Sequence, residues 1–171
     1  MAVLINTNKR NDYQNYDVLD KTIRYVTRNN GSDRSDLIGY GGAGVILHKG
    51  INNLIYSMEL PQNIWNIGQI VGPKLYHWVL DLTLEETQLF HNDKSKMCQY
   101  AKMCSCAFWE RGYQCIYGIH INPDNSIHIH FVISALNYID GLRFSRETMQ
   151  LCQYESYFNG LLNQYRHHCS G

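Results

Sequence analysis

The chain has 171 residues, and its 15 Lys and Arg balance its 15 Asp and Glu, so the formal net charge is zero. This length predicts one domain over residues 1–171, large enough for a hydrophobic core without cross-links. Because its charge is balanced, the chain lacks the overall positive charge that is typical of nucleic-acid-binding proteins, although a local basic patch can suffice for such binding. The six cysteines form no Cys-x-x-Cys pair, and no apolar run reaches the ~18 residues that span a bilayer. We therefore expect a soluble, cytoplasmic protein without membrane insertion.

The chain begins with a short apolar strand at Ala2–Asn6, followed by a polar connection. Asp17 can cap a helix that begins near Val18. Three apolar side chains of that helix recur at helical spacing and are expected to face the core: Leu19, Ile23 and Val26.

Tyr25 lies about 120° around the same helix from its apolar stripe. Lys21 and Arg28, at i−4 and i+3, are its neighbours on the polar side. A tyrosine between two cations on an exposed helix surface is well placed to meet an anion such as phosphate. The alternative is a partly exposed tyrosine that rests beside charged side chains.

The next stretch contains the glycine run Tyr40–Val45, with the sequence YGGAGV. It has neither the phosphate-loop pattern nor the dinucleotide fingerprint. The run predicts a tight turn, or a place where backbone amides approach a phosphate. Residues 50–70 predict a short helix and an irregular connection.

The segment Lys74–Leu82 predicts a central strand that ends at Thr83, with His77 and Asp81 on one face. An aspartate inside an apolar strand needs a partner. A metal-ligand imidazole N–H is one such partner, because carboxylates commonly orient these histidines. The alternative is that Asp81 sits at the strand end and caps the next helix, where Thr83 and Glu86 form a capping box.

A long helix is expected from Thr83 to about Trp109, with a break near Asn92 and Asp93, and Gly112 stops it. After the hairpin described below, the Asp140-Gly141 pair predicts a turn. A final helix is then expected from Ser145, its cap, to about Arg166. The order β–α–β–α–β–β–α predicts an α+β fold, in which helices flank a central antiparallel β-sheet.

Three histidines fall within eleven residues, at His120, His128 and His130. His128 and His130 share one face of an apolar strand, and the turn cluster Pro123–Ser126 folds the preceding strand back beside it. His120 can therefore approach the other two across the hairpin. Three neutral imidazoles on a rigid sheet predict a facial metal site with open positions for water or a substrate oxygen. An isolated strand histidine is more often an ordinary half-buried polar residue.

Together these residues resemble the HUH endonucleases, and specifically the relaxases of mobilisable and conjugative elements in the MobP-type group. The resemblance spans roughly Ala2 to the final helix. It is carried by these motifs: Tyr25 in Thr22–Arg28, His120-x7-His128-x-His130, Tyr40-Gly41-Gly42-x-Gly44-Val45 and Tyr76-His77-x-Val79.

The resemblance implies site- and strand-specific nicking of DNA at an origin of transfer, with a 5′-phosphotyrosyl intermediate, for plasmid mobilisation in the bacterial cytoplasm. Tyr25 would be the nucleophile, and the three histidines would hold Mn²⁺ or Mg²⁺, although such sites also bind Zn²⁺ or Ni²⁺ in vitro. Asp81 would orient a histidine, a role that His77 could also fill. The expected partners are single-stranded or hairpin origin DNA, with accessory relaxosome and coupling proteins.

Local cations would contact the phosphates of that DNA, while exposed tyrosines stack on its bases. The candidate cations are Lys21, Arg24, Arg28, Arg34, Arg143 and Arg146.

Two other functions compete with this interpretation. A rolling-circle replication initiator shares the metal site but usually places its tyrosine on a later helix, where this chain has Tyr154, Tyr157 and Tyr165. A non-catalytic metal- or DNA-binding module would close the fourth metal position with Cys or His. Cys115 is five residues before His120, however, and is expected on the opposite face of the strand.

Overall fold

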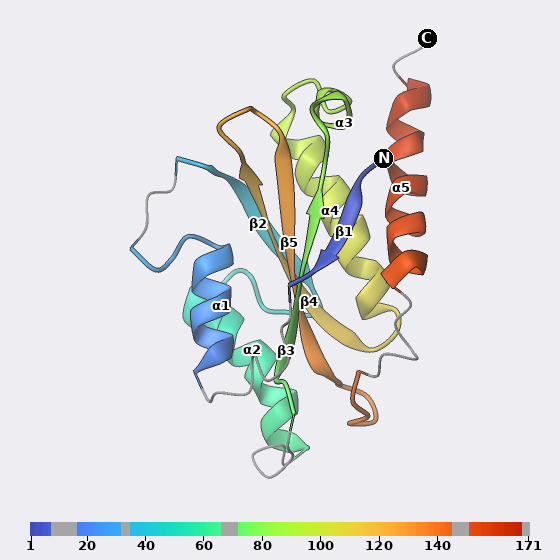
Figure 1. The fold of residues 1–171 in the computed structure, drawn as a ribbon. Coiled ribbons are helices and arrows are strands. Elements are labelled where there is room, and N and C mark those ends of the chain that lie inside the picture. The colour runs from blue at the N-terminus through green and yellow to red at the C-terminus, as the bar shows by residue number, and fades with distance from the viewer. Residues whose placement is uncertain (8–16, 32–34, 66–71, 145–150, 169–171) are drawn as a thin grey trace.

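The computed structural model describes residues 1–7, 17–31, 35–65, 72–144 and 151–168. Within these residues the chain forms a five-stranded antiparallel sheet with the order β1-β3-β5-β4-β2 (Figure 1). The strands are β1 (Val3–Asn6), β2 (Leu37–Ala43), β3 (Leu75–Asp81), β4 (Tyr113–Ile121) and β5 (Ile127–Asn137). The predicted α+β fold with a central antiparallel sheet is confirmed.

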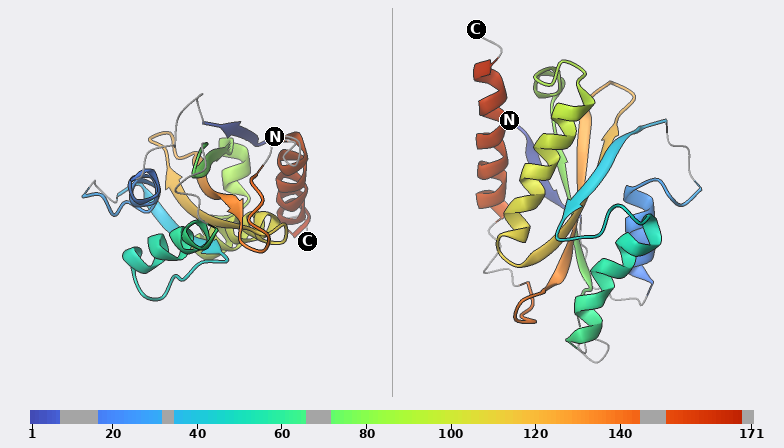
Figure 2. Two further views of the ribbon diagram at one scale, coloured as in Figure 1. Left: turned by 90° about the horizontal axis from the view of Figure 1, so that it is seen from below. Right: turned by 180° about the vertical axis from the view of Figure 1, so that it is seen from behind.

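Helices cover both faces of this sheet, as the view from below in Figure 2 shows. On one face lie α1 (Val18–Val26) and α2 (Ile51–Ile64), and on the other lie α4 (Lys94–Trp109) and α5 (Leu151–His168). The short α3 (Leu84–Gln88) connects β3 to α4. The sheet therefore has a separate hydrophobic core on each face.

The alternation of side chains along β5 determines which face receives the histidines. Ile129 and Phe131 are buried against α4 and α5, whereas Val132 is buried beneath α1 and α2. Successive strand side chains point to opposite faces. His128 and His130 therefore share the face of Val132, where α1 lies.

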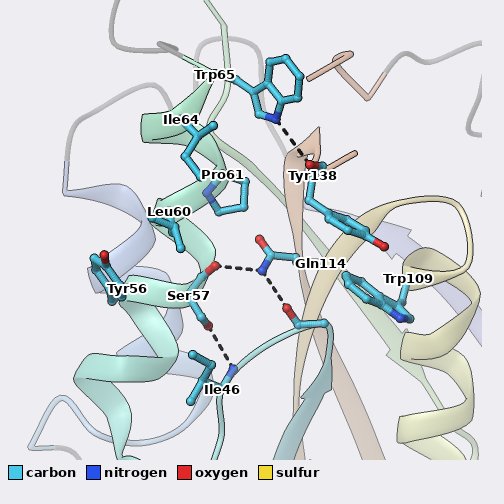
Figure 3. Close-up of a pocket in the computed structure, with 11 residues that line it drawn as sticks. Ile46, Tyr56, Ser57, Leu60, Pro61, Ile64, Trp65, Trp109, Gln114 and Tyr138 are labelled. Carbon is cyan, nitrogen blue, oxygen red and sulfur yellow. Dashed lines mark hydrogen bonds between the residues drawn. The ribbon is translucent and has the colours of Figure 1, made fainter. Parts of the chain in front are cut away.

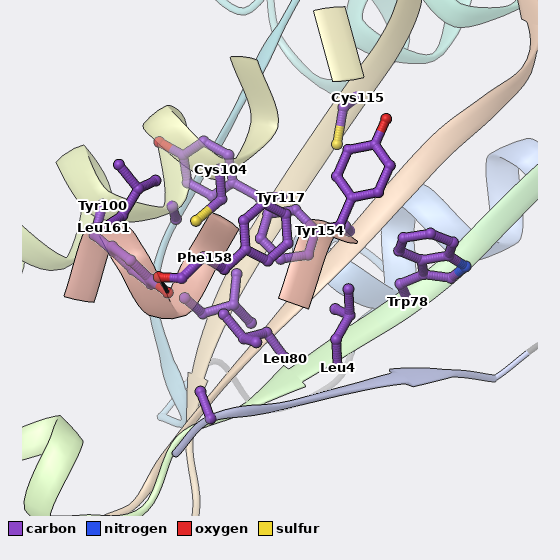
Figure 4. Packing of buried hydrophobic residues seen from close by; sticks show 14 of the residues in the cluster. Leu4, Trp78, Leu80, Tyr100, Cys104, Cys115, Tyr117, Tyr154, Phe158 and Leu161 are labelled. Atoms are coloured by element: carbon purple, nitrogen blue, oxygen red, sulfur yellow. Dashed lines mark hydrogen bonds between the residues drawn. The ribbon is translucent and has the colours of Figure 1, made fainter. Parts of the chain in front are cut away.

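The core beneath α4 and α5 is rich in aromatic rings, several of which Figure 4 shows. Phe108 of α4 and Tyr154 of α5 stack with their ring centroids 4.6 Å apart, and Trp78 of β3 meets Tyr154 edge-on at 5.7 Å. Large buried rings contribute much apolar area in defined geometry. This core holds the back of the sheet rigid behind the histidines.

The glycine run of residues 40–45 is mostly strand, so the predicted tight turn was wrong, and the alternative of a phosphate contact stays a prediction. Most of it belongs to the edge strand β2, which pairs with β4 and was absent from the predicted element order. A Cβ added at Gly41 would lie 2.5 Å from Oη of Tyr117. A side chain at Gly41 would displace the Tyr117 ring of the neighbouring strand, so close packing favours glycine there.

The helices also differ from prediction in detail. α2 has 14 residues where only a short helix was expected. The side chain of Asp17 makes no capping hydrogen bond to α1 and instead pairs with Lys21 at 2.6 Å. The predicted start of the final helix at Ser145 lies outside the described residues, and the described part of α5 begins at Leu151.

Other helix signals are confirmed. Thr83 and Glu86 form the predicted capping box at α3. The expected break near residues 92–93 separates α3 from α4, and the Asp93 side chain accepts from the backbone N–H groups of Ser95 and Lys96. Gly112, with φ +85°, follows the end of α4.

Candidate metal centre and active site

The β4–β5 hairpin brings the three histidines together through its register. His120 pairs directly with His128, and His130 lies opposite Gly118 on the same two strands. One ring nitrogen from each histidine lies within 4.8 Å of the others. The predicted convergence of His120, His128 and His130 is therefore present in the structure.

Hydrogen bonds determine which ring nitrogen of His120 and of His130 is left to face the centre of the histidine cluster. Nε2 of His120 lies 2.8 Å from the carbonyl oxygen of Val26, at the end of α1. A carbonyl only accepts, so Nε2 carries the hydrogen and Nδ1 keeps its lone pair. Nδ1 of His130 lies 2.8 Å from Nε2 of His77, which leaves Nε2 of His130 free.

Those two remaining nitrogens are the strongest structural sign of a metal ligand set. Nδ1 of His120 and Nε2 of His130 are buried and have no hydrogen-bond partner in the described part of the chain. Buried polar atoms normally have a partner, and one that lacks it calls for an explanation. A divalent cation that accepts both lone pairs is such an explanation, so these residues fit the expected metal.

Burial keeps all of these rings neutral. It lowers the pKa of His77 from 6.5 to about 4 and, together with the nearby His77, that of His130 to about 2. Burial also lowers the pKa of His120 and of His128. Neutral imidazole is the form that binds a metal, so the cluster is in its ligand form at neutral pH.

The C-terminal end of α1 is held directly over this cluster. A Cβ added at Gly118 of β4 would lie 2.6 Å from Cγ1 of Val26 and would overlap the Val26 carbonyl oxygen. The missing side chain at Gly118 thus lets α1 rest on the sheet, with its Val26 carbonyl directed at His120. The negative end of the helix dipole points to the same place, which favours a bound cation.

Tyr25, on the last turn of α1, lies beside the three rings. Its ring centroid is 5.6 Å from that of His130 and 6.5 Å from those of His77 and His120, in edge-on arrangements. The side chain is 43% exposed, so a substrate can reach it. A residue 95 positions before His120 in the sequence is thereby placed within the same site.

Arg28 adds a fixed positive charge next to Tyr25. Its guanidinium carbon lies 4.9 Å from the Tyr25 ring centroid, and its Nη1 donates to the Tyr25 carbonyl oxygen at 3.1 Å. The same guanidinium forms a two-nitrogen salt bridge with Asp36, and this contact lowers the pKa of the carboxyl group. Sequence analysis missed Asp36, which no motif marks.

The structure separates the two candidates for orienting a metal ligand. Asp81 is exposed at the end of β3, where it pairs with His128 in the register. Burial lowers the pKa of His128, and the negative charge of Asp81 acts in the opposite direction by raising it. Asp81 makes no hydrogen bond to an imidazole among the described residues and does not cap α3, whose cap is Thr83. His77 makes the direct contact, to His130.

The candidate DNA-binding cations are dispersed. Lys21 pairs with Asp17 and Arg24 pairs with Asp20 on α1, whereas Arg28, which pairs with Asp36, lies two residues past the end of that helix. Arg143 is not brought to the cluster, because it bridges to Leu136, six positions along β5 from His130. Arg34 and Arg146 lie outside the described residues.

The residues that the two competing functions would use lie on the face of the sheet opposite the histidines. Tyr154, Tyr157 and Tyr165 are on α5, where Tyr154 is buried against Phe108. Cys115 is fully buried in the same core as Phe108 and is not directed at the histidines. The predicted opposite orientation of Cys115 is confirmed.

Comparison with protein-family models identifies the class that this fold and site define. Residues 39–166 match the relaxase family described as MobA/VirD2-like, nuclease domain. The match covers most of the chain, so the protein belongs to this family and is a DNA strand-transferring endonuclease. Comparisons with curated proteins and with solved structures gave no significant match. None of the helices in the described ranges is long and apolar enough to cross a membrane.

Proposed function

We propose that this relaxase nicks one DNA strand at an origin of transfer by transesterification, with Tyr25 as the nucleophile. The observation that carries the proposal is the position of the Tyr25 ring, 5.6 Å from His130 in a cluster with two bare, buried ring nitrogens. A nucleophile and a cation site for phosphate are the two parts that such a reaction requires.

His120, His128 and His130 would hold the divalent ion, with Mn²⁺ or Mg²⁺ as the expected metal and Zn²⁺ or Ni²⁺ as in vitro substitutes. When bound, the ion would supply Lewis-acid stabilisation of the negative charge on the scissile phosphate. Because all three ligands are neutral, they leave the positive charge of the ion uncompensated for that phosphate.

The protein groups then carry the covalent step. Tyr25 Oη releases its proton to solvent and bonds to phosphorus, while the bond from phosphorus to the 3′ oxygen breaks. That oxygen takes up a proton from solvent and leaves as a hydroxyl. The product is a 5′-phosphotyrosyl ester, which the 3′ hydroxyl can attack to rejoin the strand. Arg28, anchored by Asp36, keeps a positive charge beside the Tyr25 ring throughout.

His77 acts as a positioning residue in this proposal. Its Nε2 holds Nδ1 of His130 at 2.8 Å, and a partner of this kind fixes the tautomer and ring orientation of a metal-binding histidine. Asp81 would contribute only through its charge beside His128.

The proposed setting is the bacterial cytoplasm during plasmid or conjugative-element mobilisation. The substrate would be single-stranded or hairpin origin DNA, bound by one domain over residues 1–171, with accessory relaxosome and coupling proteins as further partners. Lys21 and Arg24 on α1, with Arg28 just past its end, are the cations nearest in sequence to the nucleophile and would contact the DNA backbone.

The test is incubation with labelled single-stranded oligonucleotides tiled across candidate origin sequences, with Mn²⁺ and then with excess chelator. We expect a protein–DNA complex that survives denaturation in Mn²⁺ and disappears with chelator. The Tyr25→Phe variant should bind Mn²⁺ normally and form no adduct. An adduct that persists in chelator would contradict the metal role, and one that survives in Tyr25→Phe would contradict the nucleophile.

A further inference from the structure

A pocket of about 330 Å³ opens at the opposite end of the sheet from the histidines, beside the C-terminal half of α2 (Figure 3). This volume is at the lower end of the range for small organic ligands. Its lining carries no formal charge and includes four large aromatic side chains: Tyr56, Trp65, Trp109 and Tyr138. The site therefore suits a compact, uncharged, flat group.

One buried polar atom in this pocket lacks a partner. Gln114 is 5% exposed, and its Nε2 donates to the carbonyl oxygens of Gly44 at 2.7 Å and Ser57 at 2.8 Å. Two acceptors at the nitrogen fix the orientation of the amide. Oε1 is left without a hydrogen-bond donor among the described residues, and Figure 3 shows it turned toward Pro61, within the pocket lining.

The aromatic side chains form flat walls around that acceptor. Trp109 stacks on Tyr138 at 4.3 Å with an interplanar angle of 10°, and the Trp65 indole N–H donates to the Tyr138 carbonyl oxygen at 3.4 Å. At the rim, Tyr56 is 53% and Trp65 is 40% exposed. A flat heterocycle with an N–H group would stack on these rings and donate to Gln114 Oε1. Nucleobases have this chemistry, and aromatic platforms bind them with little regard to sequence.

The pocket is also on the same sheet face as the histidines, at a distance that a bound strand could span. Gln114 contacts Ser57 of α2, so it is on the same sheet face as His120, six residues further along β4. At roughly 3.3 Å per residue the separation is about 20 Å. A stacked strand advances about 3.4 Å per nucleotide, so about six nucleotides or fewer span that distance.

We propose that this pocket binds one unpaired base of single-stranded DNA, a few nucleotides from the phosphate at the histidine cluster. The inference rests on the proposed function for its choice of ligand. The base would stack against the rim rings and satisfy Gln114, and so would hold the strand in register over α1 and α2.

The test is photo-cross-linking with an oligothymidylate of about 20 nucleotides that carries 5-iodouracil, in chelator so that no strand transfer is needed. Mass spectrometry should locate cross-links at Tyr56, Trp65 or Tyr138. Removing one stacking ring, in Tyr56→Ala or Trp65→Ala, should weaken binding by about 5- to 150-fold. Tyr56→Phe, which keeps the ring, should retain affinity. Tyr157→Ala is the matched control, because Tyr157 is a similarly exposed helical tyrosine on the other face.

Each outcome decides a separate point. Cross-links confined to the neighbourhood of Tyr25, with unchanged affinity in Tyr56→Ala and Trp65→Ala, would overturn the inference and would favour a peptide from a partner protein as the occupant. In an oligomer of N3-methylthymidine whose photoreactive base is N3-methyl-5-iodouracil, no base carries an N–H group, and equal cross-linking of that oligomer to the pocket would overturn the hydrogen bond to Gln114. Failure of the proposed function appears differently, as pocket cross-links without any metal-dependent adduct.

Discussion

Gly118→Ala should move α1 away from the histidines, because the new methyl group meets a helix that rests directly on β4. Its Cβ would lie 2.6 Å from Cγ1 of Val26 and would overlap the Val26 carbonyl oxygen. Overpacking of this kind costs about 1–3 kcal/mol. For a domain of this size the melting temperature should fall by about 2–12 °C.

The same change should impair the site. The Val26 carbonyl orients His120, and Tyr25 precedes Val26 in the chain. A displacement of about 1 Å can cost roughly a hundredfold in rate, so we expect weaker Mn²⁺ binding and a much slower adduct reaction. Calorimetric titration and a timed denaturing gel measure these two quantities.

Gly160→Ala is the matched control, because the added Cβ meets nothing within 4 Å in the described part of α5. Alanine in a helix should stabilise the protein by about 0.5–1 kcal/mol and leave adduct formation unchanged. A Gly118→Ala variant with the melting temperature, Mn²⁺ affinity and adduct rate of the parent would refute the reasoning about α1.

Three further predictions concern the histidines and Arg28. His77→Phe should lower Mn²⁺ affinity by about 10- to 100-fold, and His77→Gln should restore most of that affinity. Equal affinity in the parent and both variants would refute the positioning role of His77. In chelator, burial holds the pKa values of His77 and His130 below 6.5, so the unfolded state binds more protons below that pH. The melting temperature should therefore fall from pH 6.5 toward pH 5, and a flat profile would contradict this assignment. Arg28→Gln should slow adduct formation by about tenfold or more, whereas exposed Lys21→Gln should change it by less than about fivefold.

The sequence was sufficient to predict the histidine site because its information is local. The spacing of His128 and His130 places both on one face of a strand, and the intervening turn brings His120 opposite them. Tyr25 could be selected only by its cationic neighbours and by family resemblance, since its approach to the cluster depends on how α1 packs on the sheet. Gly118 carried a readable signal, because a glycine inside an apolar strand often marks a close backbone approach.

Other features could not be read in this way. β2 is glycine-rich because Cys98, Tyr117 and the Cys115 backbone occupy the space of its side chains, so strand propensity was misleading there. The contact between His77 and His130 depends on the pairing of β3 with β5, which no local pattern specifies. The pocket around Gln114 is assembled from α2, the end of α4, β4 and the residues that follow β2 and β5, and it exists only once these elements are packed.

The most direct test of the central claim is the location of the covalent bond to DNA. After reaction in Mn²⁺, protease and nuclease digestion with mass spectrometry should find the residual nucleotide on the peptide that contains Tyr25. A nucleotide on Tyr154, Tyr157 or Tyr165 of α5 would contradict the account, because those tyrosines lie on the opposite face of the sheet from the histidines.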